Sequence, residues 1–260
     1  MLLDINAYVG HWPFKQLQFN TCEKLLKRMN KFGVDVSVVS SLNGIFYKNT
    51  QSANEELLSE IGSDQRFVER LIPFAVINPI YAGWKDDLET SVEMGMKGVR
   101  LYPKYHDYEF TDPSCVELVK RIRDHGLPIA LTLRMVDSRQ RSWMDIEKEW
   151  ELKDILPIVK EVPDARYIVL NIATSTELSE GDEKIIKKST IVFDTSGREI
   201  SDLSGLLSRF GKEKFAFGTH SPILDYLTGL LRIEALRSDE ADEETKERLR
   251  SGNAKRFLGL

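Results

Sequence analysis

The sequence predicts a (β/α)8 barrel, the TIM-barrel fold, built as a single domain over residues 1–260. Three observations predict it. The chain has 260 residues, a length at which such barrels fold as one domain. Its apolar runs are short and rich in β-branched residues, as strands buried on both faces are. Between these runs lie longer charged segments whose apolar residues are three and four positions apart, the spacing of amphipathic helices.

Eight apolar runs predict the strands, in order residues 2–8, 34–40, 70–77, 97–102, 128–134, 166–171, 190–194 and 214–218. The charged segments predict the helices, at about residues 20–32, 52–62, 83–95, 114–125, 145–161, 177–188, 200–210 and 222–237. Strands that alternate with helices form a parallel sheet. An open doubly wound sheet is the alternative, but it would need an early glycine-rich phosphate turn, and Val9-Gly10-His11 is not a GxGxxG motif.

The end of the chain predicts two further features. Residues 238–250 form a run of mixed charges, SDEADEETKERLR, which is typical of a solvated helix face. Residues 253–258 are more apolar and are placed to dock back on the barrel. We find no internal repeat and no flexible linker, which is why a single domain is expected.

Composition excludes several classes of protein. The 36 Lys and Arg against 41 Asp and Glu give a net charge of −5, whereas a nucleic-acid-binding protein usually has a basic stripe. Cys22 and Cys115 are the two cysteines, too few for a disulfide scaffold or a four-thiolate zinc site. The first residues do not resemble a signal peptide, and no apolar stretch is long enough to span a membrane. We therefore expect a cytoplasmic protein that binds neither nucleic acid nor membrane, and a homo-oligomer is left open.

Polar side chains stand at the ends of the predicted strands, where such barrels carry their chemistry. Asn6 and Tyr8 are two residues apart on one strand and therefore point to the same side. The other candidates at strand ends or in the loops that follow are Arg100, Tyr102, Arg134, Asn171, Asp194, His220, His11 and His106.

Two arginines and one histidine carry the expected chemistry. Arg100 and Arg134 come from neighbouring strands and would clamp a carboxylate or phosphate, unless they pair with structural carboxylates. The unperturbed pKa of a histidine, about 6.5, would suit His220 as a general base or acid, and Asp194 could orient its ring. A polar residue that merely closes the barrel top is the alternative for His220. His106 and His11 lie in aromatic loops that either face the substrate or simply pack.

Four segments, taken in order, resemble the amidohydrolase superfamily, in particular its amidohydrolase-related (amidohydrolase 2) branch of TIM barrels. They are DINAY at 4–8, KGVRLYP at 97–103, FGTHSP at 217–222 and GNAKRFLGL at 252–260. The resemblance covers the chain from end to end and implies a hydrolase with a divalent metal. It also shows where this chain departs from the family: Asn6 and Tyr8 replace a histidine pair, Asn171 stands near another histidine position, and His220 replaces the metal-binding aspartate.

These departures lead us to expect no cofactor, with a divalent metal at a rearranged site as the open alternative. We expect hydrolysis of a small carboxylated molecule, such as a lactone, ester or amide. In this hypothesis His220 activates water with Asp194 and His106, and the substrate contacts come from Arg100, Arg134, Asn6, Tyr8, Asn171, His11 and Tyr102. A decarboxylase or other lyase of the same branch is one alternative. A barrel without catalytic activity that binds a ligand or partner is the other.

Overall fold

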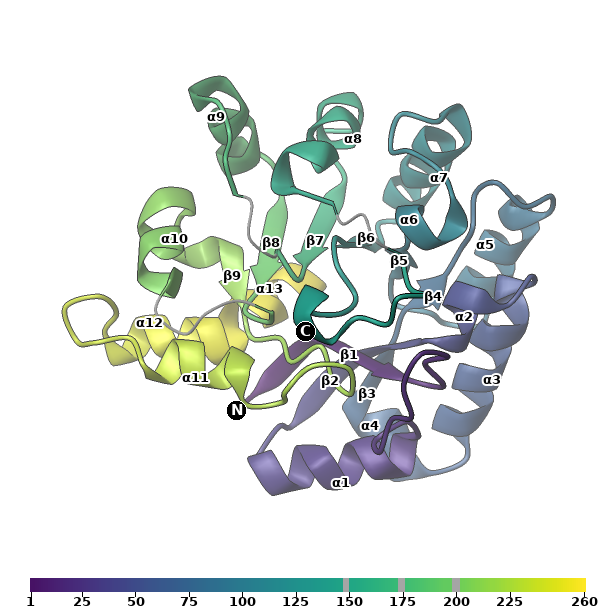
Figure 1. Cartoon of the computed structure of the whole chain (residues 1–260), viewed down its shortest axis with the longest axis horizontal. Helices are drawn as coiled ribbons and strands as arrows, with labels where there is room; N and C mark the ends of the chain where they lie inside the picture. The colour runs from purple at the N-terminus through teal and green to yellow at the C-terminus, as the bar shows by residue number, and fades with distance from the viewer. Residues whose placement is uncertain (147–149, 173–175, 198–201) are drawn as a thin grey trace.

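The computed structural model describes residues 1–146, 150–172, 176–197 and 202–260. Its strands gather at the centre, and helices surround them (Figure 1). All strand pairs are parallel and run in two sheets, β1-β2-β3 and β4-β5-β6-β7-β8-β9. The strands are β1 Leu3–Val9, β2 Val36–Ser41, β3 Leu71–Pro73, β4 Ala75–Val76, β5 Val99–Leu101, β6 Pro128–Thr132, β7 Arg166–Leu170, β8 Ile191–Asp194 and β9 Phe215–Ala216.

Backbone hydrogen bonds join the two sheets at both seams. Only Phe74 separates β3 from β4, and its N–H donates to the Val39 carbonyl at 2.9 Å. On the other side β1 pairs with the chain that follows β9, since the Ile5 N–H donates to the Phe217 carbonyl at 3.0 Å and the His220 N–H to the Asn6 carbonyl at 2.7 Å. The predicted (β/α)8 barrel is confirmed, and its eighth strand position continues past β9 to His220.

The helices follow the strands as predicted, and most of them are shorter than predicted, whereas the helix predicted over residues 52–62 begins two residues earlier. The main ones are α1 Cys22–Phe32, α3 Thr50–Gly62, α5 Trp84–Glu93, α7 Pro113–Asp124, α8 Leu156–Glu161, α9 Glu180–Lys188, α10 Leu203–Phe210 and α11 Thr228–Glu234. Short helices were not predicted at α2 Asn43–Phe46, α4 Gln65–Arg70 and α6 Pro103–His106, whereas α12 Glu243–Glu247 falls within the charged run that was predicted to be helical. No helix among the described residues is long and apolar enough to cross a membrane.

Two predicted helices are wrong in their first halves because tertiary contacts hold the chain otherwise. Residues 147–149 of the predicted helix 145–161 lie outside the described residues. Trp150 donates its backbone N–H to the Leu133 carbonyl at 3.1 Å, which ties the segment to the end of β6. In the predicted helix 222–237, the His220 carbonyl accepts from the N–H groups of Ile223 and Leu224, so the chain turns tightly over the barrel mouth before α11.

The last helix, α13 Asn253–Leu258, docks on the barrel as predicted. Asn253 donates from Nδ2 to the carbonyls of Lys212 at 2.9 Å and Phe215 at 2.8 Å. Ala254 is buried in the barrel interior with Leu3 and Val192. The charged run before it is only partly solvated, because Leu249 is buried and Arg250 forms ion pairs with three glutamates.

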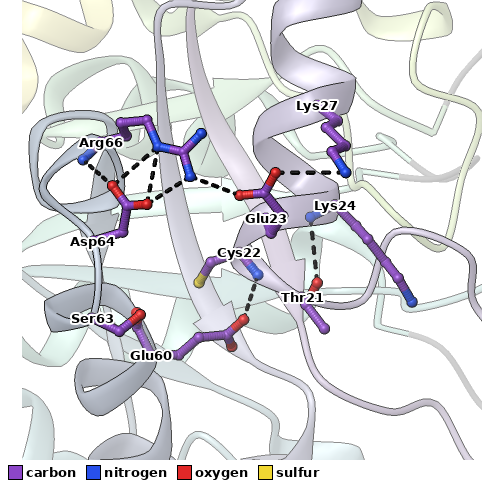
Figure 2. A network of polar contacts seen from close by, with 9 residues as sticks. All are labelled: Thr21, Cys22, Glu23, Lys24, Lys27, Glu60, Ser63, Asp64 and Arg66. Atoms are coloured by element: carbon purple, nitrogen blue, oxygen red, sulfur yellow. Dashed lines mark hydrogen bonds and ion pairs between the residues drawn. The ribbon is translucent and has the colours of Figure 1, made fainter.

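The barrel interior is filled by side chains, so that polar chemistry is confined to its ends. Phe74 occupies the interior opposite Gly98, where an added Cβ would lie 2.5 Å from the Phe74 ring. Outside the barrel, polar contacts fix the helices to one another. Figure 2 shows the start of α1, where Thr21 caps the helix and Glu60 of α3 accepts from the Cys22 N–H at 2.7 Å.

Candidate functional site

The predicted polar residues meet at the carboxyl ends of the strands, inside the barrel mouth. Asn6, Arg100, Asn171, Asp194 and His220 are all fully buried. Residues from five different strand ends, between positions 6 and 220 of the sequence, therefore share one small volume, as side-chain parity and strand order predict.

Asp194, the last residue of β8, is the centre of one network. Its Oδ2 accepts from Asn6 Nδ2 at 2.6 Å and from the Ser196 hydroxyl, and its Oδ1 accepts from the Asn171 N–H at 2.7 Å. Burial raises the pKa of Asp194, and these three hydrogen bonds act in the opposite direction. Ser196 was not among the predicted site residues, although it lies two residues after Asp194 and so projects to the same side.

His220 is held by hydrogen bonds at both ring nitrogens. Nε2 lies 2.8 Å from the Met135 carbonyl, which can only accept, so Nε2 carries the hydrogen. Nδ1 is then the acceptor and lies 3.0 Å from Asn6 Nδ2. Burial, together with the charges of Arg100 and Arg134, lowers the pKa of His220 to about 3. His220 is therefore a neutral imidazole of fixed tautomer.

The expected direct contact between Asp194 and His220 is replaced by a bridge. Asn6 lies between them and directs Nδ2 to both, so the order is Asp194–Asn6–His220. We call Asn6, Asp194, Ser196 and His220 the Asp194 network. Asn171 and His220 also have left-handed backbones, with φ of 53° and 57°, a strained conformation for residues other than glycine and one found preferentially at functional sites.

Arg100, on β5, differs from this network in its hydrogen bonding. Its guanidinium lies over the Tyr8 ring, 4.3 Å from the centroid, and Nη1 donates to Asn6 Oδ1 at 3.3 Å. Nε and Nη2 have no hydrogen-bond partner among the described residues. The same is true of the Tyr102 hydroxyl and the Thr132 hydroxyl, both buried nearby at the ends of β5 and β6. We call Arg100, Tyr102 and Thr132 the Arg100 pocket.

Arg134 does not lie beside Arg100 as a matched half of a clamp. Its Nη2 donates to the Gly197 carbonyl at 2.5 Å and to Asn171 Oδ1 at 3.3 Å, toward β7 and β8. Arg134 and Tyr102 line a hollow of about 20 Å³ above the buried residues, room for about one water molecule. The charged residues that line this mouth hollow are Lys104, Arg134 and Arg141, all basic.

Two predicted histidines lie apart from the network. His106 is buried under α2, where Nε2 is 3.3 Å from the Gly44 carbonyl, and burial lowers its pKa to about 4. Its ring packs 6.0 Å from that of Tyr102, so it supports the Arg100 pocket from behind. His11 is exposed, and its backbone N–H donates to Asn43. The packed-loop interpretation therefore describes both residues better than direct contact with the Asp194 network.

The donor set does not fit the divalent metal that the resemblance implies. Among the described residues there is no group of three or more His, Cys, Asp and Glu that could hold a metal ion. In the Asp194 network, the one imidazole lone pair accepts from Asn6 and the one carboxylate accepts from three donors. The Arg100 cation, hydrogen-bonded to the same Asn6, adds a like charge where a metal would stand.

Comparisons with known proteins give the fold. No protein-family model matches the chain, and no curated protein matches it. Among solved structures, 2,6-dihydroxybenzoate decarboxylase from Rhizobium matches with a TM-score of 0.74 and 12% identity, over 100% of this chain and 98% of that one. The 5-carboxyvanillate decarboxylase from Sphingomonas paucimobilis matches with a TM-score of 0.70 and 12% identity, over 100% and 99%.

A third structure, a probable 2-pyrone-4,6-dicarboxylic acid hydrolase from Acinetobacter baumannii with citric acid bound, matches with a TM-score of 0.63 and 11% identity, over 100% and 99%. At such identities the likeness establishes the fold alone. The chain has a TIM-barrel fold similar to that of these enzymes, as predicted from the sequence.

Proposed function

We propose that this chain is a hydrolase of a small carboxylated molecule and that Arg100 binds the substrate carboxylate inside the barrel mouth. One observation carries the proposal. Arg100 is fully buried beside the neutral phenol groups of Tyr8 and Tyr102, yet two of its guanidinium nitrogens complete no hydrogen bond of good geometry among the described residues. Buried charges in proteins are normally paired, because an unpaired one loses hydration without compensation. A bound carboxylate would supply the missing partner.

The position of the unpartnered atoms suits a carboxylate in particular. Nε and Nη2 lie on the same edge of the guanidinium plane, so their two parallel N–H bonds can reach both oxygens of one carboxylate. The hydroxyls of Tyr102 and Thr132 can donate to the same oxygens or to a neighbouring group of the substrate. Burial raises the pKa of Tyr102 well above its ordinary value, which keeps this hydroxyl protonated and able to donate.

In the proposed reaction His220 accepts the proton of the attacking water. Nδ1 must exchange its hydrogen bond from Asn6 for one from water, while Asn6 keeps its bond to Asp194. The water oxygen bonds to the substrate carbonyl carbon, its proton moves to Nδ1, and His220 later returns that proton to the leaving group. The Nε2–H bond to the Met135 carbonyl stabilises the imidazolium in between. Tyr8, whose ring contacts both Arg100 and His220, would donate to the developing oxyanion.

Decarboxylation is the second candidate. Two of the similar structures are decarboxylases of carboxylated aromatic acids, and the Arg100 pocket is fully buried. A carboxylate desolvated there would be closer in free energy to neutral carbon dioxide than it is in water. Release of carbon dioxide without consumption of water would favour this reaction over hydrolysis.

The test is a screen of lactones, esters, amides and aromatic acids with the wild-type chain and two variants. We expect Arg100→Gln to raise KM by about 100-fold, since one charged bidentate contact is lost. We expect His220→Gln to abolish turnover while binding persists, because Gln preserves the donor and acceptor but cannot take a proton. Arg66→Gln is the control for Arg100, since Arg66 also lies over an aromatic ring, that of Phe67, on the outer helix α4. Unchanged carboxylate binding in Arg100→Gln would refute the proposed function.

A further inference from the structure

The end of the barrel opposite the mouth carries a larger hollow, about 420 Å³ in volume. It is lined by the first residues of β7 and β8, by the turn that precedes β9, and by α13. Because all strands are parallel, these strand starts lie at the amino end of the barrel, whereas Arg100 and Asp194 lie toward the carboxyl end. We call it the amino-end hollow.

Three cationic side chains converge on this hollow: Arg166, Lys214 and Arg256. Arg166 Nη1 donates to the Gly126 carbonyl at 3.1 Å, and Lys214 Nζ donates to the Ser189 carbonyl at 2.8 Å. Arg256 Nη2 makes only long contacts of 3.4 Å, to the Glu213 carbonyl and Asn253 Oδ1. None of the three forms an ion pair with a carboxylate among the described residues, and the hydrogen-bond acceptors named above are all neutral oxygens.

The one acidic residue of the lining, Glu213, attracts Lys214 but forms no ion pair with any of the three cations in the described part of the chain. The carboxylate of Glu213 folds over Gly211, where its Oε1 lies 2.4 Å from the position a Cβ would take. Several surface arginines, by contrast, are paired with carboxylates. Arg250 contacts three glutamates and Arg66 contacts Asp64 and Glu23, as Figure 2 shows for the latter. The lining of the amino-end hollow has an excess of positive charge, with three cations against the single acidic side chain of Glu213.

Burial makes these unpaired charges costly. It lowers the pKa of both Arg166 and Lys214, and for Lys214 the attraction of Glu213 offsets the effect only in part. An apolar wall completes the hollow, since the Arg166 guanidinium lies 5.1 Å from the centre of the Phe257 ring and Ile191 and Val192 line the opposite side. A ligand with anionic oxygens and a compact body would match both parts of the lining.

We infer that the amino-end hollow is a second binding site, for a small anionic molecule that carries phosphate or carboxylate groups. Two guanidinium groups can each donate two parallel hydrogen bonds to such oxyanions, and Lys214 adds a point charge. The site is separate from the Arg100 pocket and does not depend on the proposed reaction. A ligand here would bridge β7, β8 and α13, and would so stabilise the docking of α13 on the barrel.

Calorimetric titration at low ionic strength tests the inference, with pyrophosphate as the phosphate probe and citrate as the carboxylate probe. We expect saturable binding of at least one probe by the wild-type chain, and the stronger probe identifies the ligand chemistry. The Arg166→Gln/Arg256→Gln double variant should bind that probe at least about tenfold more weakly, because two charge-assisted contacts are lost. Lys255→Gln removes one positive charge from the same helix outside the lining, and should leave the affinity within about twofold.

Two further measurements keep the result unambiguous. Arg256 is exposed, so Arg256→Gln alone should fold like the wild-type chain and still weaken binding. Arg100→Gln should leave pyrophosphate binding unchanged, which separates this site from the barrel mouth. Absence of saturable binding of both probes by the wild-type chain, or equal affinity in the double variant, would overturn the inference.

Discussion

The two halves of the barrel mouth differ in how completely their buried polar atoms are hydrogen-bonded. In the Asp194 network every carboxylate oxygen and both imidazole nitrogens have partners within 3.0 Å. In the Arg100 pocket two guanidinium nitrogens and two hydroxyls have none among the described residues. A fully matched network holds its own geometry, whereas unmatched buried donors have a free-energy cost that a ligand can remove. We therefore infer that the Asp194 network positions the catalytic groups and that the Arg100 pocket binds the substrate.

The largest expected effect comes from breaking the matched half. Asn6→Leu keeps the volume but leaves Asp194 and His220 without the amide that joins them. We expect the free energy of unfolding to fall by about 3–5 kcal/mol, as when one partner of a buried charged network is removed. Urea unfolding measures it. A loss below about 1 kcal/mol would mean that the network does not hold the site together.

The pH dependence of stability is the next largest effect. The pKa of His220 is lowered from 6.5 to about 3 in the folded protein. As pH falls below 6.5, the unfolded chain binds a proton that folded His220 does not, so the wild-type chain loses stability. Gln at this position cannot titrate. The difference in unfolding free energy between wild type and His220→Gln should change by up to about 1.4 kcal/mol per pH unit.

Urea unfolding of both proteins between pH 7 and pH 4.5 measures this difference. His125→Gln serves as control, because His125 is partly exposed at the end of α7. A difference between wild type and His220→Gln that stays constant over this range would contradict the assignment of His220 as a buried neutral imidazole.

The smallest expected effects come from removing one hydroxyl from the Asp194 network and one from the Arg100 pocket, which allows the two to be compared directly. Ser196→Ala removes a donor that Asp194 accepts, and should cost about 1–3 kcal/mol of stability. Thr132→Val removes a hydroxyl without a partner, so stability should change by less than about 1 kcal/mol. Affinity for a carboxylated ligand should instead fall roughly three- to tenfold in Thr132→Val. Equal losses of stability in the two variants would remove the distinction.

Strand order and side-chain parity explain how much of this site could be predicted from the sequence. Asn6, Arg100, Asp194 and His220 were found because polar residues at the ends of parallel strands must meet at one end of the barrel. The bridge through Asn6 was not found, since it depends on which way one amide points and on the tautomer of His220. The wrong first halves of helices 145–161 and 222–237 have the same origin: contacts of Trp150 and His220 with distant backbone override local periodicity.

The amino-end hollow shows a similar limit. Arg166, Lys214 and Arg256 are at least 42 residues apart from one another and form no motif in the sequence. Only the docking of α13 beside β8 and β9 brings them to one hollow. Whether a charged side chain is paired depends on which residues lie near it in space, and the pattern of a single sequence does not give those neighbours.

The most direct test of the central claim is a crystal structure of the chain with a small carboxylated ligand, such as a lactone carboxylate or an aromatic acid, at saturating concentration. We expect to see a ligand carboxylate whose two oxygens lie within hydrogen-bond distance of Arg100 Nε and Nη2, next to the hydroxyls of Tyr102 and Thr132. A ligand bound in the mouth with its carboxylate away from Arg100, while these two nitrogens still lack a partner, would contradict it.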